Sequence, residues 1–314
     1  MRGGKSGGIC VRGKEKAGKS CVEAGKNRIF APMKTGLVLE GGGLRGLFSA
    51  GVMDVMMEAG IRFDGIVGVS SGATFGCNYK SGQPGRVLRY NLRFRDDPRY
   101  MGLRSLLRTG DLVGAEFSYH LMPDELDIFD REAYDADPAE FHVVCTDVRT
   151  GEPVYHRIDR MSDEELDWIR ASASMPIVSR PVRLGGRLLL DGGISDSIPL
   201  RYFQGQGFLR NVVILTQPKG FLKRETRLMP LFHVFMRRCP AIIRAMSRRH
   251  LMYNDELSYL AEQEREGNIL LICPRDTLPI GRTEQDEAKM RRVYQMGRKV
   301  AGEVMPAVRA FLGL

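Results

Sequence analysis

The amino-acid sequence predicts an α/β fold with a mainly parallel central sheet. Two strand, loop and helix units follow one another: an apolar strand at 35–40 precedes a helix at 44–58, and a strand at 65–69 precedes a helix that begins near residue 71. A parallel pair of strands needs a long crossover, usually a helix, so two such units in succession indicate neighbouring parallel strands.

Later segments extend the predicted sheet. The runs NVVILT and NILLIC are continuously apolar, which is typical of parallel strands that are buried on both faces. The Gly185-Gly186 turn separates two short runs that suit a hairpin. Residues 86–140 are charged and are predicted to be helix or loop. The remaining expected elements are strands at 141–146, 153–156, 181–184, 187–190, 211–216 and 268–273, and a closing helix at 284–311.

Length, composition and charge favour one soluble or peripheral domain, expected over residues 33–314 of the 314-residue chain. The apolar fraction is 43%, and no uninterrupted apolar run approaches the ~20 residues that a membrane-spanning helix needs. The formal net charge is +9, of which residues 1–32 hold +6. The excess is therefore mostly a property of that segment, and no nucleic-acid partner is expected.

Residues 1–32 are predicted to be a disordered basic tail, because they are rich in Gly and Lys and have little apolar periodicity. The tail lacks the apolar core of a secretory signal, and an over-called translation start before Met33 is an alternative to a functional extension. The six cysteines have neither CxxC nor metal-ligand spacing, which predicts reduced thiols in a cytoplasmic protein. They are Cys10, Cys21, Cys77, Cys145, Cys239 and Cys273.

Ser70 is the predicted nucleophile. It lies in Gly68-Val69-Ser70-Ser71-Gly72, a G-x-S-x-G pattern between a strand and a helix. Such a reversal holds the serine in a strained conformation, and Gly68 and Gly72 relieve the clashes that side chains would make there. The helix behind the serine directs free amides at developing negative charge. On spacing alone, a serine N-cap in a glycine-rich turn is an equal alternative, with Ser71 as a second candidate for the cap.

The loop GGGLRG at 41–46 follows the first strand and also fits G-x-G-x-x-G, a dinucleotide-binding pattern. A dinucleotide site requires an acidic residue at the end of the second strand, but Asp64 precedes that strand and Ser70 ends it. The loop is therefore interpreted as an oxyanion hole built on backbone amides near Ser70. Arg45 either adds positive charge there or is solvated. The residues assigned to the loop are Gly41, Gly42, Gly43, Arg45 and Gly46.

Asp191 is the predicted general base. It follows the apolar strand at 187–190 and precedes Gly192 and Gly193. Catalytic side chains in α/β sheets gather at the carboxyl ends of strands, and partial burial there raises the pKa of a carboxyl group and makes it a better base. Taken alone, an Asp-Gly turn without chemistry is the more common interpretation.

A Ser-Asp-His triad requires a histidine, and a satisfied or surface position is favoured for each of the five. An α/β-hydrolase-type esterase that uses His233 or His250 is nevertheless the alternative enzyme. A nucleotide-binding module or an inactive lipid-binding protein is the alternative from another class. The five histidines are His120, His142, His156, His233 and His250.

Together these motifs resemble the bacterial type of the patatin-like phospholipase family, in their order and in their strand context. The resemblance covers roughly residues 34–200 and, more loosely, the C-terminal part around Met252-Tyr253-Asn254. The blocks that carry it are GGGLRG at 41–46, GVSSG at 68–72, ASASMP at 171–176 and DGG at 191–193.

The resemblance implies a three-layer α/β/α patatin-like sandwich and a serine acyl hydrolase, a phospholipase or lipid esterase that acts through an acyl-enzyme. Ser70 would accept the acyl group from a lipid or acyl-ester substrate, and Asp191 would activate it without a histidine. The glycine-loop amides would hold the oxyanion. No metal or cofactor is implied.

Residues 228–252 mix apolar and arginine residues around Pro240, which predicts a basic amphipathic helical pair. Such an element would let the protein lie on an anionic membrane surface, so peripheral membrane contact is expected through this segment. A packed helical pair with an arginine-rich solvent face is the alternative.

Overall fold

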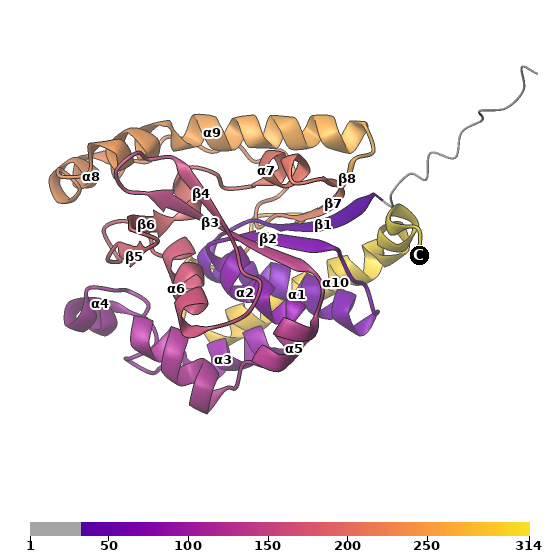
Figure 1. Cartoon of the computed structure of the whole chain (residues 1–314), viewed down its shortest axis with the longest axis horizontal. Coiled ribbons are helices and arrows are strands. Elements are labelled where there is room, and N and C mark those ends of the chain that lie inside the picture. The colour runs from indigo at the N-terminus through magenta and orange to yellow at the C-terminus, as the bar shows by residue number, and fades with distance from the viewer. Residues whose placement is uncertain (1–32) are drawn as a thin grey trace, which may run out of the picture. The chain divides into compact units, whose positions relative to one another are not determined.

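An eight-stranded sheet forms the centre of the computed structural model, which describes residues 33–314 (Figure 1). The strand order is β5-β6-β3-β2-β1-β7-β8, with β4 paired to β3 beside this path. The run from β3 to β8 is parallel, whereas β4, β5 and β6 join by antiparallel pairing. The strands are β1 (Lys34–Leu39), β2 (Gly65–Val69), β3 (Glu140–Asp147), β4 (Pro153–Arg157), β5 (Val182–Leu184), β6 (Arg187–Asp191), β7 (Phe208–Ile214) and β8 (Ile269–Ile272).

Helices cover both faces of the sheet, with α7 and α9 on one side and α1, α2 and α10 on the other (Figure 1). This arrangement confirms the predicted three-layer α/β/α fold. The helices are α1 (Leu47–Glu58), α2 (Ser71–Lys80), α3 (Arg86–Phe94), α4 (Leu103–Thr109), α5 (Arg131–Ala136), α6 (Asp163–Ser172), α7 (Leu200–Gly205), α8 (Met229–Phe235), α9 (Pro240–Arg265) and α10 (Glu287–Leu312), with short turns η1 (Gly43–Gly46) and η3 (Gly192–Ile194) and a π-helix η2 (Phe117–Leu126).

The side chains of β1 alternate between two hydrophobic cores. Leu37 and Leu39 pack into the core that contains α1 and α10, whereas Val38 packs into the core that contains Phe203 of α7 and Leu260 of α9. Successive side chains of a strand point to opposite faces, so a strand buried on both faces is apolar throughout, as the sequence predicted for this one.

The predicted basic helical pair at 228–252 is only partly right. The segment contains α8 and the first half of α9, but α9 continues to Arg265. The continuation follows from helical spacing, because Tyr253, Glu256, Leu260 and Gln263 are all buried and recur at intervals of three or four residues. The second half of α9 is therefore a packed helix on the sheet.

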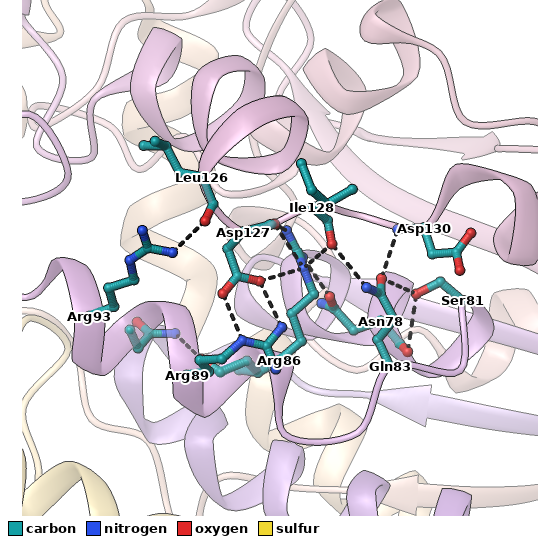
Figure 2. A network of polar contacts seen from close by, with 12 residues as sticks. Asn78, Ser81, Gln83, Arg86, Arg89, Arg93, Leu126, Asp127, Ile128 and Asp130 are labelled. Carbon is teal, nitrogen blue, oxygen red and sulfur yellow. Dashed lines mark hydrogen bonds and ion pairs between the residues drawn. The ribbon is translucent and has the colours of Figure 1, made fainter.

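A buried ion pair fixes the far end of α2, the helix that follows Ser70. Figure 2 shows Asp127 between Arg86 and Arg89 of α3, with shortest N–O distances of 3.1 and 2.8 Å. Arg86 Nη1 also donates a hydrogen bond of 2.7 Å to Asn78 Oδ1 of α2. Removing one partner of such a pair leaves a buried charge without its counter-ion, so the network ties α2 firmly to α3.

Within residues 33–314 no helix is both long enough and apolar enough to cross a membrane. The predictions for residues 1–32, including those for Cys10 and Cys21, lie outside the described residues.

Candidate active site

A sharp reversal between β2 and α2 carries Ser70. The serine has φ 55° and ψ −122°, a positive φ that residues with side chains rarely adopt. Glycines permit the reversal: a Cβ at Gly68 would lie 2.5 Å from the Gly72 carbonyl oxygen, and one at Gly72 would lie 2.3 Å from that of Leu39. Ser70, and not Ser71, occupies the N-cap position of α2, yet its side chain makes no capping hydrogen bond. The Ser70 hydroxyl is therefore not engaged in holding the helix.

Ser172, at the end of α6, anchors this reversal. Its hydroxyl accepts a hydrogen bond of 3.0 Å from the Ser70 amide and donates one of 2.6 Å to the Val144 carbonyl of β3. Ser172 is fully buried, so neither bond competes with water. The small-residue block at 171–176 thus packs directly behind the predicted nucleophile, and sequence reasoning assigned no role to Ser172.

The register of β3 brings Asp191 next to Ser70. Val69, the last residue of β2, pairs with Val144, and Asp191, the last residue of β6, pairs with Cys145. The two predicted dyad residues therefore reach neighbouring positions, although they are far apart in the sequence.

Burial raises the pKa of the Asp191 carboxyl group above its ordinary value. The nearby Ser70 side chain opposes this shift, followed by the positive charge of Arg249 and a hydrogen bond of 2.8 Å from the Gly193 amide. A raised pKa makes the ionised carboxyl a stronger proton acceptor than a surface aspartate.

The glycine loop after β1 lies against the reversal. A Cβ at Gly41 would be 2.8 Å from that of Ser70, and one at Gly43, whose φ is 59°, would be 2.6 Å from the Arg282 carbonyl oxygen. Within residues 33–314, the amides of Gly41, Gly42 and Gly43 donate no backbone hydrogen bond.

The other predicted glycines allow close packing around Ser70 and Asp191. A Cβ at Gly192 would lie 2.1 Å from the Val144 carbonyl oxygen, and one at Gly46 would lie 2.8 Å from Ser71 Oγ. Gly193 faces the Asp191 carboxylate and Arg249, whose Nε donates a hydrogen bond to the Gly193 carbonyl. The DGG turn thus holds the carboxylate close to β3 and to α9.

Ser70 and Asp191 share a cavity of about 640 Å³ with the glycine loop and Arg45. Its apolar lining, here called the apolar wall, includes Leu112, Met175, Ile177, Val178, Leu231 and Phe232. Ile177 is the other non-glycine residue with a positive φ, 74°, in the described part of the chain. Strained backbone therefore gathers at this cavity, as is common at functional sites.

The histidines divide into four that lie away from the cavity lining and one that is part of it. His142 is buried and contacts Tyr202 and Glu140, His156 stacks on Trp168, and His120 and His233 lie elsewhere. His250 is neither satisfied nor purely superficial, which corrects the expectation for it. It lines the cavity, and its Nδ1 is buried without a hydrogen-bond partner among the described residues.

In residues 33–314 the four cysteines are free, and no group of three or more His, Cys, Asp or Glu side chains is arranged to hold a metal ion.

The fold and site define an α/β protein with a serine on a strand-to-helix reversal, facing a buried aspartate. The sequence model described as patatin-like phospholipase matches residues 37–203, and a second, a domain of unknown function (DUF6363), matches residues 239–313. The chain belongs to the patatin-like phospholipase family, which confirms the resemblance seen in its motifs.

Curated relatives are similar over part of their length. The uncharacterized protein YjjU of Escherichia coli is 34% identical over 201 residues, 61% of this chain and 54% of that protein. An uncharacterized NTE family protein of Mycobacterium tuberculosis, MT2641, is 31% identical over 55% of this chain and 28% of its own length. Lysophospholipase nte1 of Aspergillus oryzae is 29% identical over 55% of this chain and 11% of its own. The chain thus spans about half or less of these relatives.

Two solved structures are similar at low identity. VipD from Legionella pneumophila aligns with 88% of this chain and 67% of its own, at 14% identity and a TM-score of 0.46. The ExoU-SpcU complex of Pseudomonas aeruginosa aligns with 90% of this chain and 52% of its own, at 16% identity and a TM-score of 0.37.

Proposed function

We propose that the protein is a lipid acyl hydrolase in which Ser70 is the nucleophile and Asp191 the general base. The observation that carries this proposal is the pairing of a serine in a strained reversal with a buried carboxylate beside it. Family membership supports the reaction class, and one partial relative is named a lysophospholipase.

In the first step, Asp191 accepts the proton of the Ser70 hydroxyl while the oxygen attacks the ester carbonyl of the substrate. The main influences on the pKa of Asp191 are burial, the Ser70 side chain, the charges of Arg249 and Arg282, and the Gly193 amide. This environment supports direct proton transfer within a dyad. The carboxyl group then protonates the leaving alcohol and an acyl-enzyme is formed.

Amides of the glycine loop stabilise the oxyanion of the tetrahedral intermediate. Gly41 packs against Ser70, and the amides of Gly41, Gly42 and Gly43 have no backbone acceptor within the described residues. Donors that are ordered before the reaction stabilise developing charge at little reorganisation cost, on the order of 3 kcal/mol for each donor. In the second step Asp191 activates water, which releases the acid and restores Ser70.

The function is tested by hydrolysis of p-nitrophenyl butyrate. Ser70→Ala and Asp191→Asn are expected to lose at least about 1000-fold in kcat/KM, since members of a catalytic unit act together. Exposed residues of α9 provide matched controls, Ser258→Ala and Asp255→Asn, which should retain activity. Full activity of Ser70→Ala would overturn the proposal.

His250→Ala separates the dyad from a Ser-Asp-His triad. Because His250 lines the cavity, it is the histidine to test. If the enzyme uses a dyad, Asp191→Asn should lose most of its kcat, whereas His250→Ala should keep most of it. A loss of about 1000-fold in His250→Ala would favour the triad instead.

We also propose that α8 and the start of α9 contact a membrane surface. Leu228, Leu231, Val234 and Phe235 are exposed, and Leu231 also lines the cavity, so this apolar edge borders the site. Exposed arginines of the same segment, Arg237, Arg238, Arg244 and Arg248, suit anionic headgroups. Arg249 does not belong to this surface, because it bonds to Gly193 inside the site.

Flotation with vesicles of phosphatidylglycerol tests this contact. Val234→Ser with Phe235→Ser, and separately the four exposed arginines replaced by Glu, are expected to reduce the bound fraction severalfold. Flotation that stays unchanged in both variants would exclude the surface.

A further inference from the structure

Basic side chains also line the cavity, and we call them its cationic wall. Among residues 33–314, five Lys or Arg side chains line the cavity, whereas Glu40 and Asp191 are the only acidic ones that do so. The basic residues are Arg45, Lys223, Arg224, Arg249 and Arg282. The cavity therefore carries an excess of positive charge next to the ester-cleaving groups.

The two carboxylates in the cavity are already engaged. Glu40 accepts hydrogen bonds of 2.6 and 3.1 Å from the Thr216 amide and hydroxyl, and one of 2.6 Å from the Tyr253 hydroxyl. Asp191 accepts a bond from Gly193 and faces Ser70. None of the ion pairs found within residues 33–314 joins either carboxylate to a basic side chain of the cavity. The excess charge is thus left for a ligand.

Lys223 is held in place by α9. Its amide donates a hydrogen bond of 2.8 Å to Asn254 Oδ1, and its carbonyl accepts one of 3.0 Å from Asn254 Nδ2. Its ammonium lies 4.0 Å from the centre of the Tyr253 ring. Within residues 33–314 this ammonium makes neither a hydrogen bond nor an ion pair. Tyr253 and Asn254, noted in the sequence without a role, therefore position a cation.

The environment of Lys223 is short of negative charge. Burial lowers the pKa of Lys223 to about 7, and the positive charges of Arg249, Arg282 and Arg45 act in the same direction. Among the main influences on this pKa only the charge of Glu40 opposes the shift, and the ammonium lies against the Tyr253 ring. A ligand with negative charge would relieve this repulsion.

Two arginines complete the wall. Arg249 of α9 is fixed by its hydrogen bond to the Gly193 carbonyl, beside Asp191. Arg282 precedes α10, and its carbonyl accepts a hydrogen bond of 3.1 Å from the Leu44 amide, which holds residue 282 against the glycine loop. The Arg282 guanidinium has no hydrogen-bond or ion-pair partner in the described part of the chain. Guanidinium groups bind phosphate oxygens in a bidentate manner, so the wall suits a phosphate group.

We propose that Lys223, Arg249 and Arg282 form a subsite for the phosphate of the substrate, which makes the substrate an anionic acyl phosphoester. This inference rests on the proposed function and specifies the headgroup of the substrate. The acyl chain would contact apolar lining residues such as Met175 and Phe232, and the phosphate would contact the basic ones. Two of the three cations come from the 239–313 segment matched by the domain of unknown function, which thereby acquires a role in substrate selection.

Proton uptake should accompany binding. A bound phosphate raises the pKa of Lys223 from about 7, so above pH 7 the free enzyme must gain a proton on binding. Affinity for the phosphoester is expected to fall as pH rises from 7 to 9, by up to about tenfold per pH unit. A phosphodiester keeps one charge over this range, so the ligand does not obscure the effect.

Calorimetry with the Ser70→Ala variant tests the subsite without turnover. The probes are hexanoyl lysophosphatidylglycerol, which is a phosphodiester, and hexanoylglycerol, which is neutral. The phosphodiester is expected to bind at least about tenfold more tightly, and Lys223→Met or Arg282→Gln should each remove roughly tenfold of this preference. Lys219→Met, an exposed lysine paired with Glu264, is the matched control and should retain it.

Equal affinity for the two esters would overturn the inference, and so would a preference that survives both substitutions in folded protein. Inorganic phosphate that binds as tightly as the phosphodiester would also overturn it, because this result would indicate a site for free phosphate. Hydrolysis of p-nitrophenyl butyrate is measured in parallel. Turnover without headgroup preference rejects the subsite alone, whereas headgroup preference without turnover rejects the proposed function alone.

Discussion

The region around Ser70 and the cationic wall of the cavity are built in different ways. The glycine loop, the Ser70 reversal and the DGG turn are short motifs at strand ends, and glycines fix their backbone geometry within a few residues. The cationic wall instead uses side chains of Lys223, Arg249 and Arg282, which come together only when α9 packs across the sheet. The region around Ser70 is therefore built from motifs that are local in sequence, whereas the cationic wall depends on tertiary structure.

Outside the two proposed dyad residues, adding one methyl group to the glycine loop should have the largest effect. Gly41→Ala would place a Cβ 2.8 Å from that of Ser70 and from the Val69 carbonyl oxygen, displacing the loop from the nucleophile. We expect kcat/KM for p-nitrophenyl butyrate to fall by at least about 100-fold, as when an oxyanion donor is lost. Gly302→Ala in α10, where nothing lies within 4 Å, is the control. An active Gly41→Ala enzyme would contradict the assignment of this loop.

As the pH is lowered, activity should be lost at a higher pH than it would be if the base had the usual pKa of an aspartate. Because burial raises the pKa of Asp191, its ionised form is lost at a pH above the usual range for aspartate. On the acid side, kcat/KM is expected to fall about tenfold per pH unit below that pKa. A pH-rate profile that remains flat down to pH 4 would argue against a buried aspartate as the base.

The anchor behind the nucleophile should have a smaller effect. Ser172→Ala removes the acceptor of the Ser70 amide and the donor to Val144. We expect roughly a tenfold lower kcat and about 1–2 kcal/mol less stability, because two buried backbone groups lose their partner. Ser258→Ala on the exposed face of α9 should change neither quantity. Thermal unfolding and kinetics of the pair decide whether Ser172 supports the reversal.

The smallest effect is a gain in stability. A carboxyl group whose pKa is raised by folding binds its proton more tightly in the folded state than in the unfolded state. Its contribution to the stability of the fold therefore falls as the pH rises from its unfolded pKa through its folded pKa. Asp191→Asn should therefore stabilise the protein at pH 7, by about 1 kcal/mol. The difference should vanish near pH 3, where the carboxyl group is protonated in both states. A destabilised variant at pH 7 would show that Asp191 supports the fold.

Most of the fold was predictable because its signals are local. Strand β2 was predicted at its observed bounds, and the hairpin of β5 and β6 followed from the Gly185-Gly186 turn. The full extent of α9 was not predicted, because the arginine-rich pattern that marks its first half ends near residue 252. The buried residues that continue it at helical spacing were the available signal.

Only the part of the candidate site that is built from local motifs was predictable. Ser70, Asp191 and the glycine loop carry motifs, and the register of β3 brings the first two together. Ser172 and Lys223 carry no motif of their own. Their positions depend on hydrogen bonds to residues about 30 to more than 100 positions away, which a single sequence does not reveal.

The most direct test of the Ser70–Asp191 dyad is the site and rate of labelling by a fluorophosphonate probe, followed by mass spectrometry of the labelled peptide. The account predicts that the native protein is labelled at Ser70, that His250→Ala is labelled at a similar rate, and that Asp191→Asn is labelled at least about 100-fold more slowly. Labelling at another residue, or rapid labelling of Asp191→Asn together with slow labelling of His250→Ala, would contradict it.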